Sequence, residues 1–151
     1  MAYQKLQVSR GLVVIPSNTV DIPFPGAEIT SSTTTGTSAL KLIDTAGDFV
    51  NKGIKIGDIV YADVAATVTA IDSATQLSVT TIVATLTAYK IYTPGKNDGC
   101  VLYVGTTGTV DVITAGGDAI LFTAVPAGMF MPVQVTRVKA TSGASTIVAM
   151  W

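Results

Sequence analysis

The last third of the chain, residues 100–151, constrains the fold more than any other part of the sequence. Five short apolar runs, at 100–104, 109–113, 119–123, 129–138 and 146–150, alternate there with tight turns that contain glycine. Charged side chains are scarce, and this segment holds only Asp111, Asp118, Arg137 and Lys139. Short apolar runs about ten residues apart, separated by turn residues, are typical of a β-sandwich or jelly roll. The segment therefore predicts a compact antiparallel β unit, and it contains no arrangement of side chains suited to catalysis.

Individual residues of this segment carry specific expectations. Pro126 and Gly128 suit a turn in which proline presets φ and glycine takes a left-handed conformation. Pro132 lies inside the longest run, so we expect an edge strand or a β-bulge there. Cys100 begins a strand and is expected to be a buried free thiol. It is the one cysteine of the chain and cannot form an internal disulfide, which favours synthesis in a reducing cytoplasm.

The first forty residues are expected to be largely irregular. Residues 1–10 predict an arm that is either disordered or laid on a neighbour. Residues 12–15, LVVI, predict a short strand, and three prolines between positions 16 and 25 then forbid a helix and predict an extended loop. The low-complexity polar stretch TSSTTTGTS at 30–38 predicts a linker or an exposed loop rather than a core element.

The middle of the chain predicts a second, smaller β unit. Strands are expected at 68–71, 76–80 and 89–92, with further apolar residues between 54 and 61. Four or five short strands in about sixty residues suggest a small curved sheet or an SH3-like barrel. Residues 48–53 could form a single helical turn. The one rival helix, at 81–88, is disfavoured by its many β-branched residues.

Composition excludes several classes of protein. Charged residues make up only 13% of the chain, against about 25% in typical domains, and the net charge is -1. No basic stripe is present, so we expect no nucleic-acid partner. No run of about 18 apolar residues exists, so we expect no membrane-spanning helix. So little charge indicates a surface covered by partner chains, together with a neutral polar surface supplied by 23 threonines.

The residues needed for catalysis are missing. The chain has no histidine, which removes histidine general bases, catalytic triads and zinc–imidazole sites. Asp44, Asp48 and Asp58 lie in one loop-rich stretch but lack the spacing of a calcium loop, so a solvated surface is the better interpretation. The glycine-rich stretches at 105–108 and 115–117 lack a following helix and are interpreted as hairpin turns. We therefore expect no enzyme, no metal and no cofactor.

Two apolar features point instead to an interaction surface. Met129, Phe130 and Met131 form a strongly apolar run beside a turn, and the sequence closes on the apolar residues 147–151. Trp151 is expected to be either part of the last strand or an anchor into a neighbour. Exposed apolar surface of this kind often marks a binding site. A carbohydrate site built on Trp151 is the less favoured interpretation, because a single aromatic residue would be its only support.

Four motifs give the last third of the chain a resemblance to a known family. They are LYVG at Leu102–Gly105, F-x-x-VPAG at Phe122–Gly128, P-x-x-V-x-R-V at Pro132–Val138, and a final IVA with an aromatic residue at Ile147–Trp151. This run resembles a module of tailed-phage and gene-transfer-agent virion proteins, including spike-base-like and head-decoration-like proteins. In short members of that module, a segment like VVIPSNTVDIPFPG leads almost directly into LYVG.

Here roughly 70 residues intervene, so the resemblance implies a discontinuous all-β fold. Residues 1–10 would be an N-terminal arm. Residues 11–30 and 94–151 would form a β-sandwich or jelly-roll-like domain, completed by the strand around 12–15. Residues 31–93 would be an inserted small SH3-like β-barrel module, and part of this insert also resembles small β modules of phage structural proteins.

The resemblance also implies a function. The chain would be a virion structural protein, assembled in the bacterial host cytoplasm and placed on the exterior of the capsid. It would decorate or cement the head by bridging major capsid subunits, as a homo-oligomer expected to be a trimer, with neither nucleic acid nor membrane as a partner. A tail spike-base or fibre-attachment adaptor and a host-surface glycan-binding module carried by 31–93 are the alternatives. The residues expected at the interface are Tyr3, Leu6, Arg10, Pro16, Pro23, Phe24, Pro25, Met129, Phe130, Met131 and Trp151.

Overall fold

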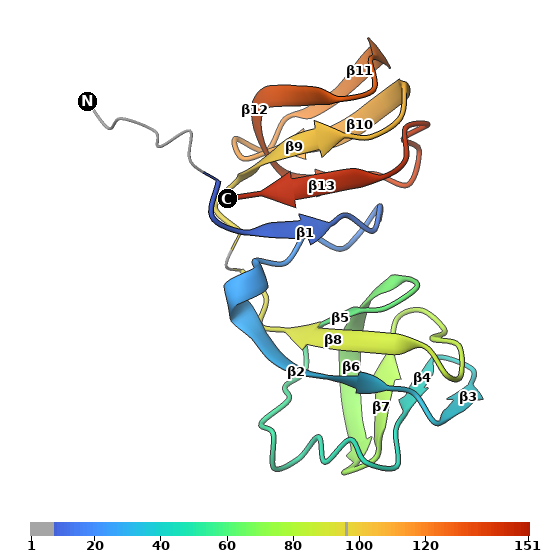
Figure 1. The fold of residues 1–151 in the computed structure, drawn as a ribbon. Coiled ribbons are helices and arrows are strands. Elements are labelled where there is room, and N and C mark those ends of the chain that lie inside the picture. The colour runs from blue at the N-terminus through green and yellow to red at the C-terminus, as the bar shows by residue number, and fades with distance from the viewer. Residues whose placement is uncertain (1–7, 96) are drawn as a thin grey trace. The chain divides into compact units, whose positions relative to one another are not determined.

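The protein is all-β, as predicted. The structure is a computed structural model, and it describes residues 8–95 and 97–151. Within this part of the chain there is one short 3-10 helix, Pro25–Ala27, and no α-helix. No helix in the described residues is long and apolar enough to cross a membrane. The chain divides into two compact units, one formed by Met1–Pro25 with Asn97–Trp151 and the other by Gly26–Lys96 (Figure 1).

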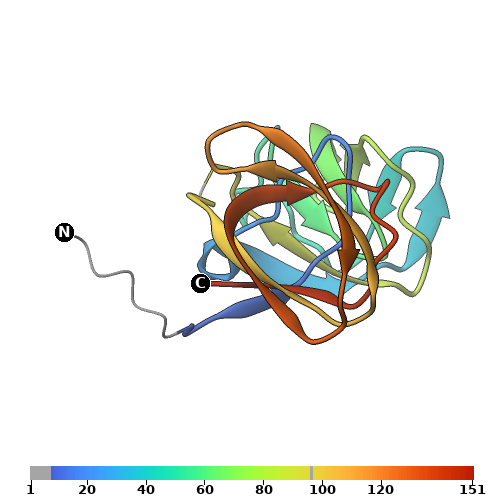
Figure 2. The ribbon, with the colours of Figure 1, turned by 90° about the horizontal axis from the view of Figure 1, so that it is seen from above.

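The first unit contains one antiparallel sheet of six strands. They are β1 (Gly11–Val13), β9 (Cys100–Val104), β10 (Gly108–Thr114), β11 (Ala119–Val125), β12 (Met129–Val138) and β13 (Ile147–Met150). Their order across the sheet is β1-β13-β9-β12-β10-β11, and Figure 2 shows how strongly the sheet curls. The five strands predicted in residues 100–151 are all confirmed. The short N-terminal strand pairs with β13, placing Leu12 opposite Ala149, as the resemblance implies.

Strand β12 bends in the middle and joins the two halves of this sheet. Its first residues pair with β9, where Met131 lies opposite Leu102, and its last residues pair with β10, where Val138 lies opposite Val112. The pairing with β9 shifts register between Met131 and Val135. Pro132 falls inside this shift, since proline cannot donate to the strand ladder. The predicted irregularity is therefore a bulge in a central strand, not an edge strand.

The predicted turn and thiol in this unit are also confirmed. Gly128 adopts a φ of 81°, in the left-handed region, and its N–H donates to the carbonyl of Val104. Cys100 is a free thiol that is only 2% exposed. It belongs to an aliphatic core whose members alternate along each strand, as one buried sheet face requires. Burying each Val, Leu or Ile side chain of that core contributes roughly 1.5–3 kcal/mol.

The second unit contains one antiparallel sheet of seven strands. They are β2 (Glu28–Thr33), β3 (Gly36–Ser38), β4 (Lys41–Ile43), β5 (Ile59–Tyr61), β6 (Ala65–Ser73), β7 (Gln76–Val79) and β8 (Ala88–Tyr92). Their order is β2-β8-β5-β6-β7-β4-β3. The strands predicted at 68–71, 76–80 and 89–92 are confirmed within β6, β7 and β8. Residues 49–53 form turns, and one helical hydrogen bond joins the Lys52 N–H to the Asp48 carbonyl.

The prediction of a linker or exposed loop at residues 30–38 is wrong. This stretch contributes to β2, which pairs with β8, and to β3, which pairs with β4. Thr34 between them is fully buried, and its hydroxyl donates to the Ala84 carbonyl at 2.6 Å and accepts from the Thr87 N–H at 2.9 Å. Threonine is common both in exposed loops and in strands. The composition could not distinguish the two, because the partners lie about fifty residues away.

The boundaries between the units also differ from the expected ones. The insert was expected to span 31–93, whereas the second unit spans Gly26–Lys96. Strand β2 explains the difference at the first boundary, because it starts at Glu28 and pairs with Tyr92 of β8 from its first residue. Residues 28–30 therefore belong to the second sheet.

Candidate interaction surface

The first unit carries an apolar groove where the start of β9, the middle of β12 and the end of β13 meet. The groove has a volume of about 600 Å³. Its lining residues are Val8, Gly99, Cys100, Val101, Phe130, Met131, Pro132, Gln134, Met150 and Trp151. No charged side chain is among them. The three strands meet here because β9 pairs with β13 on one side and with β12 on the other, and the irregular pairing around Pro132 falls at this point.

The groove has a buried floor and an exposed apolar rim. Cys100 and Met131 form the floor and are 2% and 3% exposed. Phe130 and Val8 stand on the rim and are 60% and 43% exposed. A phenyl ring that is more than half exposed gains little from folding, since the hydrophobic free energy scales with the area removed from water. This surface is therefore suited to bind an apolar partner.

Trp151 is held in place at one end of the groove by Asn97. The Nε1 of Trp151 donates to the Asn97 Oδ1 at 3.3 Å, and that oxygen also accepts from the Gly99 N–H at 3.0 Å. The Asn97 Nδ2 donates to the carbonyl of Ile22 at 2.9 Å and to that of Thr136 at 3.3 Å. One amide side chain thus connects the indole to β12 and to the loop of residues 16–25, which we call the proline loop.

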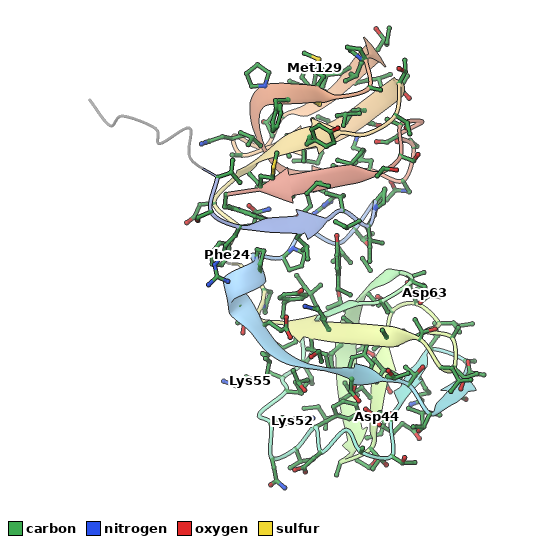
Figure 3. The ribbon with its side chains drawn as sticks, in the orientation of Figure 1. Phe24, Asp44, Lys52, Lys55, Asp63 and Met129 are labelled. Atoms are coloured by element: carbon green, nitrogen blue, oxygen red, sulfur yellow. The ribbon has the colours of Figure 1, made fainter. Side chains whose placement is uncertain are left out.

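An aromatic and cationic stack supports the other side of Trp151. The ring of Phe24, which is labelled in Figure 3, meets the indole edge to face, with centroids 5.6 Å apart, and the Arg10 guanidinium lies 5.8 Å from the Phe24 centroid. The backbone of Arg10 also pairs with Trp151, through N–H to carbonyl bonds of 3.2 and 3.0 Å in opposite directions. The stack and the hydrogen bond to Asn97 together fix the orientation of the indole.

The proline loop is tied along the second half of β12. The carboxylate of Asp21 accepts from the Arg137 guanidinium at 2.7 Å, and the Arg137 Nη1 donates to the Asn18 carbonyl at 3.0 Å. Backbone bonds from Ser17 to Val138 and from Ile22 to Thr136, both 2.9 Å, continue the attachment. The loop remains irregular, as predicted, but it is anchored.

The residues predicted at an interface have different environments. Phe130, Met131 and Trp151 line the groove, while Arg10 and Phe24 support it from the side. The remaining described residues do not line it: Met129 is 39% exposed at the start of β12, Pro16 is exposed, Pro25 is half-buried and Pro23 is buried. Tyr3 and Leu6 lie outside the described residues.

Sequence reasoning missed Asn97, Val8 and Gln134. Asn97 falls in the stretch 93–99, which we interpreted only as a boundary rich in turn residues. Asparagine in a turn is common, and its four hydrogen bonds connect positions up to 75 residues apart in sequence. Nothing in the local pattern indicates them.

Two of the three aspartates that were expected on a solvated surface are buried and hydrogen-bonded within the second unit. Asp44 and Asp58 are 1% and 3% exposed, so the predicted solvated surface is wrong for both, while Asp48 is exposed. Asp44 accepts from the Tyr89 hydroxyl at 2.7 Å and from the Ala46 N–H at 2.9 Å. Asp58 accepts from the Lys55 N–H at 2.8 Å. Across the described part of the chain, no cluster of three potential metal ligands occurs.

The Asp44 carboxylate stays ionised although it is buried. Burial by itself favours the neutral form, but hydrogen bonds from Tyr89, from Ser32 and from a backbone N–H outweigh it and hold the pKa of Asp44 below its ordinary value. The same environment raises the pKa of the Tyr89 hydroxyl, first through burial and then through its bond to the carboxylate. The pair therefore acts as a fixed donor and acceptor that fastens the loop after β4 to β8.

A second, more polar hollow lies beside β2, β5 and β8 in the second unit. Its volume is about 420 Å³, and it is lined by Ser31, Ser32, Thr33, Tyr61, Ala88, Tyr89 and Lys90. Lys90 is committed to an ion pair with Glu28 at 2.9 Å. The rings of Tyr61 and Tyr89 are buried, so neither presents a face for stacking.

No protein-family model, curated protein or solved structure matches the chain.

Proposed function

We propose that this chain is a structural protein of a tailed-phage virion, which decorates the exterior of the capsid and cements neighbouring major capsid subunits. One observation carries the proposal. Two of the motifs that resemble virion modules, Pro132–Val138 and Ile147–Trp151, supply the bent strand and the terminal strand of the uncharged groove. The residues of the resemblance thus form a binding surface, and they carry no catalytic group.

The groove suits an extended apolar segment of a capsid subunit. Its floor is buried, its rim is aromatic and aliphatic, and the Gln134 side chain and strand backbone can orient a peptide. Stable protein interfaces bury about 1,200–2,000 Å², which is more than a groove of this size provides alone. A homo-oligomer that binds several subunits of one shell gains strength through multivalency, because each later contact forms at high effective concentration.

The proposal includes the finer description of the two units. We propose that the first unit is a β-sandwich-like domain and that the second is an SH3-like module displayed from it. The curl of the six-stranded sheet and its single enclosed core support the first description. The consecutive antiparallel strands β5, β6 and β7, joined by tight connections and packed around a separate core, support the second.

Copy number in purified particles tests this function. A decoration protein is present in hundreds of copies, in fixed proportion to the major capsid protein. A handful of copies would instead place the chain in the tail, as a spike-base or fibre-attachment adaptor, and its absence from particles would refute both.

A groove variant tests the mechanism. Phe130→Glu places a charge on the rim at an exposed position, so the fold should survive while occupancy on the capsid falls at least tenfold. Ile56→Glu is the matched control, because Ile56 is 70% exposed in the other unit. Deletion of residues 1–7 tests the arm and retains the Arg10 pairing with Trp151. Full occupancy of the Phe130 variant would show that the groove does not bind the capsid. Full occupancy after the deletion would show the same for the arm.

The polar hollow supports a second candidate, binding of a host-surface glycan. Ser31 and Thr33 are exposed and present their hydroxyl groups on one face of an edge strand, which suits a polyhydroxylated ligand. The whole chain would be applied to a glycan array beside a variant of the exposed Ser31, Ser31→Leu. Binding that is lost in the variant supports this function, and no binding by the wild-type chain excludes it.

A further inference from the structure

Strand β11 is a free edge of the six-stranded sheet. It pairs on one side only, with β10, where Val110 lies opposite Phe122 and Val112 lies opposite Ile120. Residues 119–122 keep a regular register, and the irregularity of the pairing falls after them, where Ala124 has a φ of 54°. The backbone groups on the outer side of this regular stretch therefore have no strand partner in the described sheet.

The side chains of β11 are also poorly buried. The strand reads AILFTAV, and of its seven residues only Val125 is buried and Phe122 half-buried. Ile120 and Leu121 are 38% and 55% exposed, although they point to opposite faces. Both faces of the strand thus leave apolar surface in water.

The other free edges in the described part of the chain are protected. Strands β1 and β3 have three residues each. Strand β2 is longer, but it consists mainly of serine and threonine and carries Glu28, which pairs with Lys90. Natural proteins shorten or charge their edges in this way to prevent unwanted pairing. Strand β11 has neither protection, since it has seven residues and no charge or proline.

These features specify the chemistry of a partner. A row of outward N–H and C=O groups is satisfied by another extended backbone, and uncharged apolar side chains are matched by the same kind of side chain. A second copy of β11 meets both conditions, because like charges directly opposite one another would be destabilising and this strand has none. An interface between identical strands forms about a twofold axis, which requires the antiparallel arrangement.

We propose that β11 pairs with β11 of a second copy, so that the two six-stranded sheets become one continuous sheet. This inference rests on the homo-oligomer of the proposed function and names the strand that forms its contact. The contact itself does not require a capsid. A twofold contact gives a dimer or another even-numbered assembly, in place of the trimer that the resemblance implies. It leaves the groove of each copy available, because no residue of β11 lines it.

The mass of the full chain in solution tests the pairing. Light scattering at increasing concentration should show twice the monomer mass for the wild type. Leu121→Lys should weaken self-association at least tenfold, because two ammonium groups would meet near the axis. Ile82→Lys is the control, since Ile82 is similarly exposed at 52% in the other unit, and it should retain the dimer. A wild-type monomer at all concentrations, or a Leu121→Lys dimer as tight as the wild type, would overturn the inference.

Single cysteines identify the strand that makes the contact. Cys100 is buried, so a thiol introduced at each of residues 119–124 in turn would be the one accessible thiol of that variant. Oxidation should join two copies efficiently at positions near the axis, since a disulfide needs Cα atoms roughly 4.4–6.8 Å apart. A dimer in solution without any cross-link in this scan would place the interface elsewhere. These results are independent of particles, so a chain that dimerises through β11 but is absent from virions would refute only the proposed function.

Discussion

The bond between Tyr89 and Asp44 allows a quantitative test of the second unit. Tyr89→Phe removes the hydroxyl that donates to the Asp44 Oδ2 at 2.7 Å, between two side chains that are each 1% exposed. The ring itself is kept, together with its contact with Phe49 at a centroid distance of 6.3 Å, so no large cavity forms. The change therefore isolates one hydrogen bond to a buried carboxylate.

The expected loss is about 2 kcal/mol in the free energy of unfolding at pH 7. Hydrogen bonds to charged groups contribute about 1.5–3 kcal/mol, and removing one donor leaves a buried acceptor unsatisfied. Asp44 retains its bond from the Ala46 N–H at 2.9 Å, which keeps the loss within that range. A change of 2 kcal/mol corresponds to roughly a 30-fold change in the folding equilibrium constant.

The sign of the pH dependence follows from the lowered pKa of Asp44. A carboxyl whose folded pKa lies below its unfolded value stabilises the fold above its ordinary pKa of about 4, and this contribution is lost as the pH falls through the folded pKa. The difference between Tyr89→Phe and the wild type should therefore be largest near neutral pH and should narrow below about pH 4 as Asp44 is protonated.

Urea denaturation followed by circular dichroism measures both effects. Fluorescence of Trp151, the single tryptophan, reports separately on the first unit. Tyr103→Phe is the control, because Tyr103 is half-buried on β9 and packs on Phe130, and it should change stability by less than about 0.5 kcal/mol. If Tyr89→Phe is as stable as the wild type at pH 7, the hydrogen bond does not stabilise the unit. If the loss of stability is the same at pH 3 as at pH 7, it does not depend on the ionised form of Asp44.

Three further predictions concern the first unit. Gly108→Ala should lower the free energy of unfolding, measured by thermal denaturation, by about 1–3 kcal/mol, because the added Cβ would lie 2.6 Å from a backbone nitrogen. Gly117→Ala should lower it by about 1 kcal/mol through backbone strain alone, because Gly117 has a φ of 92° and open space around it. Arg137→Lys should loosen the proline loop, seen as faster amide exchange around Asp21, because lysine cannot reproduce the forked contact; exchange at the wild-type rate would contradict this. Cys100 should resist alkylation at pH 8 until the chain unfolds, since burial raises the pKa of its thiol to about 12, and rapid labelling of the folded chain would show that the thiol is accessible.

The C-terminal strands could be predicted because their information is local. The alternation of apolar and polar residues within β9 and β10, and turn residues such as Gly128, indicate strand and turn without knowledge of any partner. The same holds for the bulge at Pro132, which follows from the missing N–H of proline. The failure at Thr34 has the opposite cause, because its buried hydroxyl depends on carbonyls about fifty residues away in sequence.

The sequence by itself determined the all-β class, the strands of the last third and the apolar character of Phe130 and Trp151. Only the tertiary structure decided that β12 lies between β9 and β10, that Asn97 holds the indole, and that β11 is left at an edge with both faces exposed. The reason is that strand and turn propensities act over a few neighbouring residues, whereas the order of strands in a sheet is set by pairings between residues far apart in the chain. A groove and a free edge are products of that order, so neither can be found in any one segment of the sequence.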